Sequence, residues 1–101
     1  MLITRFLKDF IQAGALTLIT ADGRTHKFVG AEQGPDITLR LHKRSLEWTL
    51  GLRPDPGFGN AYVDGSLTIE DGTLRDFMWI ANRNFEILKR AQPSGLGRIT
   101  Q

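Results

Sequence analysis

One short run places the strongest constraint on how this chain can fold. Between Ile37 and Leu41, apolar residues alternate strictly with Thr38 and Arg40. Because successive side chains of a strand point to opposite faces, this pattern predicts a strand with one buried face. A sheet with one apolar face needs a second layer to cover it. We therefore expect a sheet with helices packed against one side.

Two segments have the helical periodicity that such a layer needs. Residues 1–12 carry apolar side chains at helical spacing, with Arg5, Lys8 and Asp9 opposite and Gly14 as a stop. The second helix follows Asp71, which we expect to cap it. Its predicted apolar stripe is Leu74, Phe77, Met78, Ala81, Phe85 and Leu88. Off this stripe lies a second apolar surface beside basic groups, predicted to contact lipid, another domain or a second copy: Trp79, Ile80, Arg83 and Ile87.

A hairpin is predicted between residues 15–20 and 24–30, which are rich in β-forming residues and joined by Asp22-Gly23. This pair suits a two-residue type I′ turn, in which both central positions have positive φ. Such a turn would place Ile19 opposite His26 and Thr17 opposite Phe28. Both faces of this hairpin are partly apolar, so the pattern leaves open which one is buried.

The middle of the chain predicts two short helices and a last strand. Residues 43–50 form the first helix, ended by Gly51, and Asp55 caps the second, with Pro56 at its first position. Asp64 and Gly65 close the second helix, and residues 66–70 supply a strand. The predicted fold class is α+β, a small mostly antiparallel sheet of about four strands, hairpin first, covered by helices.

Length and composition bound the domain organisation. The chain of 101 residues, 41% hydrophobic and 24% charged, suits one globular domain, which we assign to residues 1–91. Proline, serine and glycine accumulate in residues 92–101, which we expect to be a linker toward a further domain. Lys8 and Asp9 interrupt the opening apolar pattern, so it does not indicate a signal peptide or a membrane span. We expect a cytoplasmic protein, peripheral to the inner membrane where it contacts one.

The residue types that carry catalysis do not converge in this sequence. His26 and His42 are far apart and have no neighbouring nucleophile, and the chain has no cysteine. Glu70 and Asp71 would point to opposite faces of a strand, which disfavours paired acid and base roles. The glycines near residues 57–65 lack the spacing of a phosphate-binding loop. We predict no catalytic, cofactor-binding or metal-binding residue in this chain.

Aromatic and basic residues are the remaining candidates for contact with a lipid or a partner. Phe58 and Tyr62 lie one helical turn apart, and core packing is the alternative role for both rings. Trp48 lies among the basic residues of the segment that contains Arg40 and Arg44, for which a solvated charged surface is the alternative. The formal charge of +2 is low for a nucleic-acid-binding domain, which disfavours that partner.

Residues 57–65 read Gly-Phe-Gly-Asn-Ala-Tyr-Val-Asp-Gly. This string resembles the Gly-Phe-Gly-Glu-Ala-Tyr-Met-Asp-Gly motif in the N-terminal domain of cyclopropane-fatty-acyl-phospholipid synthases and their methyltransferase relatives. The early hairpin and the strand at residues 37–42 agree with that domain in order and spacing, so the resemblance covers most of the chain to about Asn84. Asn60 replaces the usual glutamate and Val63 the usual methionine, so a function that needs the carboxylate is not carried over.

The resemblance implies a supporting role beside a catalytic domain. In that family, methyl transfer from S-adenosylmethionine to a phospholipid double bond occurs in a separate C-terminal domain, which this chain does not contain. The implied role of this part is to engage phospholipid or a membrane and to position the methyltransferase domain. The alternatives are a packing or dimerisation module and a stand-alone lipid carrier. The element order is also similar to sterol-carrier-protein-2-like modules, an analogy of fold alone.

Overall fold

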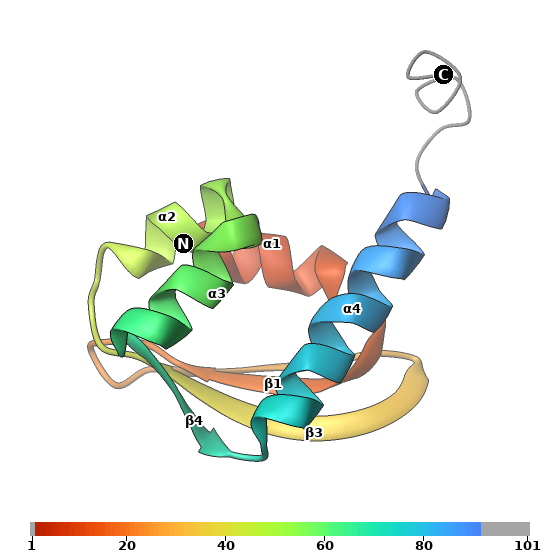
Figure 1. Ribbon diagram of the computed structural model, residues 1–101, viewed down its shortest axis with the longest axis horizontal. Coiled ribbons are helices and arrows are strands. Elements are labelled where there is room, and N and C mark those ends of the chain that lie inside the picture. Colours follow the sequence, from red (N-terminus) through yellow and green to blue (C-terminus); the bar gives the residue numbers. More distant parts are fainter. Residues whose placement is uncertain (1, 92–101) are drawn as a thin grey trace.

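The computed structural model describes residues 2–91, which form a two-layer α+β domain (Figure 1). One layer is a four-stranded sheet, and the four helices of the described part all lie on one face of it. In chain order the elements are α1 (Leu2–Phe10), β1 (Ala13–Ile19), β2 (Thr25–Val29), β3 (Glu32–Leu41), α2 (Leu46–Leu52), α3 (Pro54–Asp64), β4 (Leu67–Asp71) and α4 (Leu74–Ala91). The predicted α+β class with a four-stranded, mostly antiparallel sheet is confirmed, although the sheet is not strictly hairpin-first. The likeness to sterol-carrier modules stays a prediction.

The strand that the alternating pattern predicted is the second half of β3. Ile37, Leu39 and Leu41 are almost completely buried beneath the helices, whereas Thr38 and Arg40 lie on the opposite face. One continuous core joins these residues to apolar side chains of all four helices. The expected arrangement of a one-sided sheet with a helical cover is therefore correct.

The sheet has the order β2-β1-β3-β4 and mixes strand directions. β1 pairs antiparallel with β2 and parallel with β3, and β3 pairs antiparallel with β4. Since β2 and β3 flank β1, the chain crosses the start of β1 between them. At the crossing, the Gly30 N–H donates to the Gly14 carbonyl at 2.8 Å and the Glu32 N–H to the Gln12 carbonyl at 3.1 Å. A Cβ on Gly30 would lie 2.2 Å from the Gln12 carbonyl carbon, so only glycine fits.

The hairpin forms, but the register predicted for it is wrong by one residue. Leu18 lies opposite His26 and Leu16 opposite Phe28. In the described residues only glycines have positive φ, so Gly23 alone, at +87°, can supply it in this turn. The type I′ turn needs two such residues, and a longer loop closed by Gly23 forms instead. This register buries Leu16 and Leu18 against the helices and so settles which hairpin face is inward.

Two predicted helix boundaries in the middle of the chain are also corrected. Gly51 lies within α2 rather than after it, where a Cβ would sit 2.7 Å from the Leu2 backbone, so this glycine permits close packing of α2 on α1. Asp55 does not cap α3, which begins at Pro54 and has a non-helical backbone at Asp55 and Pro56. Gly65, in the left-handed conformation, ends α3 as predicted.

The cap of α4 is Thr73 rather than Asp71, because Asp71 is the last residue of β4. The Thr73 hydroxyl accepts a hydrogen bond from the Asp76 N–H at 3.1 Å, and the Asp76 carboxylate accepts one from the Thr73 N–H at 3.3 Å. This reciprocal pair is a capping box, which was not predicted from the sequence.

The buried face of α4 is rotated from the predicted stripe. Phe77, Ile80 and Asn84 are buried, whereas three stripe residues are largely exposed: Leu74, Met78 and Leu88. The predicted stripe contains only apolar residues, so it leaves out the polar Asn84, which is buried. Its amide instead binds backbone groups at the start of β1, which pulls Ile80 into the core. The predicted second apolar surface therefore does not include Ile80.

Candidate functional site

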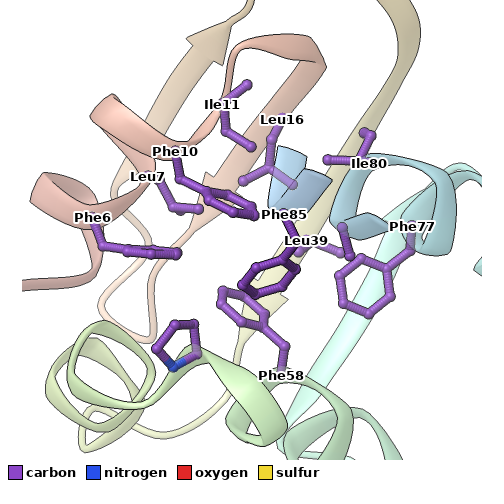
Figure 2. Close-up of a pocket in the computed structure, with 12 residues that line it drawn as sticks. Phe6, Leu7, Phe10, Ile11, Leu16, Leu39, Phe58, Phe77, Ile80 and Phe85 are labelled. Carbon is purple, nitrogen blue, oxygen red and sulfur yellow. The ribbon is translucent and has the colours of Figure 1, made fainter. Parts of the chain in front are cut away.

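An apolar cavity of about 40 Å³ lies between α1, α3 and α4, above the sheet (Figure 2). The whole empty space between its walls, open mouth included, is about 380 Å³. All twelve lining residues are apolar: Phe6, Leu7, Phe10, Ile11, Leu16, Leu39, Pro54, Phe58, Phe77, Ile80, Ala81 and Phe85. We call this space the phenylalanine cavity, because five of the six phenylalanines of the chain line it.

The phenylalanine rings come from three helices and converge on the same space (Figure 2). Phe10 of α1 stacks on Phe6 and makes an edge contact with Phe85 of α4, each with ring centroids 4.8 Å apart. Phe58 of α3 lies across from Phe77 of α4 at 6.2 Å. Helical spacing on α1, from Phe6 to Phe10, and the wider spacing on α4, from Phe77 to Phe85, place each set of rings toward the cavity.

The cavity is costly in an otherwise filled core. Protein interiors seldom retain voids larger than a water molecule, and a void forfeits about 24 cal/mol per Å³. The wall has no polar side chain, so an ordered water molecule in the cavity would find no side-chain hydrogen-bond partner. What it can bind is hydrocarbon.

Of the predicted contact residues, α3 brings Phe58 into the cavity wall and Tyr62 to its margin. The Tyr62 ring centroid lies 6.4 Å from that of Phe77, and Tyr62 is 37% exposed. Helical spacing in the sequence identified these two rings but not Phe6, Phe10 and Phe85 as contact residues. All three belong to predicted helices, but no local signal distinguishes a ring that lines a void from one that fills a core.

The remaining aromatic candidates lie outside the cavity wall. Trp48 on α2 is 60% exposed, and Leu52, one turn later, is 71% exposed. Trp79 on α4 lies against Gly34 of β3, and its neighbour Ile80 is buried beneath the helix. The structure therefore separates Trp48 from Trp79, which lie on different helices.

The basic candidates divide into paired and unpaired groups. Arg40 donates to Glu70 at 2.9 Å, and this hydrogen bond lowers the pKa of the Glu70 carboxyl. Arg83 binds Glu32 through two hydrogen bonds of 2.6 Å and also pairs with Glu86. Within residues 2–91, by contrast, Arg44 and Arg53 form no ion pair. These two cations beside α2 remain open to an external anion.

The two histidines lie in different parts of the sheet, His26 in β2 and His42 directly after β3. His42 Nε2 lies 2.8 Å from the Thr68 hydroxyl on the helix-free face of the sheet, whereas His26 Nε2 is buried and, among the described residues, has no hydrogen-bond partner. No group of three or more metal-binding side chains occurs between residues 2 and 91. Likewise, none of the helices described is long and apolar enough to cross a membrane.

Comparison with known proteins adds no relative to this picture. No family model, curated protein or solved structure matches the chain.

Proposed function

We propose that this domain is a non-catalytic module that engages phospholipid membranes. The observation that carries the proposal is the exposure of large apolar side chains on the adjacent helices α2 and α3. Trp48, Leu52 and Val63 are 60%, 71% and 85% exposed. Single exposed apolar residues are ordinary, but tryptophan with aliphatic neighbours and unpaired cations is typical of a membrane interface.

Charge supports the same surface. Arg44 and Arg53 flank α2 and are not neutralised by carboxylates in the described residues. Guanidinium groups bind phosphate through paired hydrogen bonds, so these two residues suit lipid headgroups. Arg40 and Arg83, also predicted to make contact, are less suited because each already binds a glutamate.

The resemblance of residues 57–65 supports a wider context for this role. On that basis, the domain serves a cyclopropane-fatty-acyl-phospholipid-synthase-like protein of the cytoplasm. It brings a separate S-adenosylmethionine-dependent methyltransferase domain to the inner membrane. The chemistry of such a parent protein would belong to the other domain.

Co-sedimentation with phosphatidylglycerol vesicles at low salt tests the membrane proposal. We expect the wild-type domain to sediment with vesicles, and its tryptophan emission to shift to shorter wavelength as the Trp48 indole leaves water. The double variant Trp48→Ala, Leu52→Ser should lose at least about tenfold in vesicle affinity, because it removes two apolar anchors. Met78→Ser, an exposed apolar position on α4, is the matched control. Absence of wild-type binding at low salt would refute the proposal.

A second candidate is a packing or dimerisation module, favoured by the exposed side of α4. Leu74 and Met78 are 45% and 49% exposed and lie one turn apart beside Trp79. Under this role Trp79→Ala would weaken assembly of a longer parent protein and leave vesicle binding by the isolated domain unchanged. Sedimentation velocity of both forms measures the assembly.

A further inference from the structure

We infer that the phenylalanine cavity binds the methyl end of a single fatty acyl chain. The inference deepens the proposed lipid function and rests on it, but it concerns a different part of the molecule. Membrane contact would use the outside of α2 and α3, whereas this site lies inside the helical layer.

The chemistry of the wall selects the ligand. Twelve apolar residues line the cavity, so a ligand group placed there can form no hydrogen bond with a side chain of the wall. A carboxylate, phosphate or hydroxyl would lose its hydration without compensation. Hydrocarbon loses nothing and fills a void that is already present. Enclosed apolar cavities are known to accept apolar guests, and this cavity offers a wall of the same kind.

The open mouth argues for an amphiphile rather than a small free hydrocarbon. The cavity is not closed, because the empty space of about 380 Å³ between its walls includes open solvent. A ligand can therefore reach from the cavity into solvent. A fatty acyl chain has this form, since its methyl end is apolar and its other end carries a polar group. Arg53 is exposed and precedes Pro54 of the wall, which places a cation close in sequence to the cavity.

No polar interaction between α3 and α4 opposes widening of the cavity within the described residues. As it stands it holds ~3 water-sized groups, at the ~10–15 Å³ that each requires. A longer part of the chain needs α3 and α4 to separate. Between residues 2 and 91, no hydrogen bond or ion pair joins these two helices, which meet through the rings of Phe58, Tyr62 and Phe77. An inserted chain would replace ring contacts with contacts of the same kind.

Binding of the fluorescent fatty acid cis-parinaric acid tests the inference. We expect saturable binding by the wild-type domain and a loss of about tenfold or more in Ala81→Phe, whose added ring occupies the cavity. Met78→Phe adds the same ring to an exposed position of α4 and should bind as the wild type does. Equal binding by Ala81→Phe and the wild type, or no binding by the wild type, would overturn the inference.

A measurement on the unmodified domain covers the case in which Ala81→Phe fails to fold, which circular dichroism would reveal. Stearic acid spin-labelled near its methyl end should broaden the NMR signals of Leu16, Leu39 and Phe77 before others. Broadening confined to the outer surface of α2 would overturn the inference.

Competition identifies the source of the chain. Displacement of the probe by oleic acid alone assigns a free fatty acid, whereas displacement by lysophosphatidylglycerol as well assigns a phospholipid. Failure of both to displace it would count against an acyl site. Vesicle co-sedimentation of Ala81→Phe separates the two proposals, because its membrane surface is intact. If Ala81→Phe still binds vesicles but no longer binds the probe, the result supports the acyl site in the cavity. If the wild type binds the probe but not vesicles, only the membrane-surface proposal is refuted.

Discussion

The side-chain amide of Asn84, on α4, binds both backbone groups of Ala13, the first residue of β1. Asn84 Oδ1 accepts from the Ala13 N–H at 2.9 Å, and Nδ2 donates to the Ala13 carbonyl at 2.9 Å. The same amide accepts from the Gln12 N–H at 2.7 Å and donates to the Ile80 carbonyl at 2.8 Å. Asn84 is fully buried, and all four bonds that its amide can form are made.

Asn84→Leu should therefore be among the most destabilising substitutions in the domain. Leucine has a similar size but leaves the buried Ala13 N–H and carbonyl, and the partly buried Gln12 N–H, without partners. Each such buried group costs about 1–3 kcal/mol, so we expect a loss of about 3 kcal/mol or more. Urea unfolding measures it. Asn82→Leu, at an exposed position of the same helix, should change stability by about 0.5 kcal/mol or less. Equal effects of the two variants would contradict this account.

The same residue shows where sequence reasoning succeeds and where it stops. The alternation around Leu39 and the periodicity of α1 are local patterns, and they predicted a one-sided sheet with a helical cover. The buried face of α4 depended on a bond between Asn84 and a strand start 71 residues away, which no local pattern contains.

The candidate site divides in the same way. Phe58 and Tyr62 were identifiable because one helical turn separates them. The cavity that Phe58 shares with Phe10 and Phe85 exists only because three helices fail to fill the space between them. Exposure of Trp48 likewise follows from how α2 lies on α1. Residues can thus be named from sequence, but the space between them cannot.

Gly30 should tolerate no other residue. The chain crosses β1 so closely there that a Cβ would lie 2.2 Å from the Gln12 carbonyl carbon and 2.4 Å from the Ala13 nitrogen. Both are backbone atoms, so they cannot move aside without breaking the pairing of β1 with β3. We expect Gly30→Ala to cost about 3 kcal/mol or more, or to prevent folding.

Gly59→Ala is the control for this substitution. Gly59 lies in α3, no atom lies within 4 Å of the position that a Cβ would take, and its φ is negative. Alanine should therefore stabilise the domain by about 0.5–1 kcal/mol. Thermal unfolding of both variants gives the comparison. A Gly30→Ala protein as stable as the wild type would show that the crossing is looser than described.

Stability should fall in acid, in part through Glu32. Hydrogen bonds from Arg83 lower the pKa of the Glu32 carboxyl below its usual value of 4.5. Since the folded state binds this proton less readily than the unfolded state, the pair contributes its stability above pH 4.5 and loses it as pH falls through the lowered pKa. The effect is small, because the Glu32 side chain is 42% exposed.

Arg83→Gln tests this contribution together with that of the Arg83–Glu86 pair, which the substitution also removes. We expect it to lower the free energy of unfolding at neutral pH and to have less effect at about pH 3, where the glutamate becomes protonated. Other carboxyls with lowered pKa, such as Glu70, are present in both proteins and cancel in the difference. Arg75→Gln, an exposed position on α4, should show no such pH dependence. A constant difference between wild type and Arg83→Gln would exclude the ion pair as its cause.

The contact between Gly34 and Trp79 should control the position of the indole on the surface. A Cβ on Gly34 would lie 2.5 Å from Trp79 Cζ3, and the side chain can rotate away where a backbone could not. Gly34→Ala should therefore lift the indole from β3 and move its emission to longer wavelength, at a cost on the order of 1 kcal/mol. A Trp48→Phe background leaves Trp79 as the single tryptophan. Gln33→Ala, an exposed neighbour, should leave the emission unchanged. An unchanged emission in Gly34→Ala would show that the indole does not rest on β3.

Because Trp79 is also the predicted partner contact on α4, a displaced indole in Gly34→Ala should weaken assembly with a partner as Trp79→Ala does, without removing the ring.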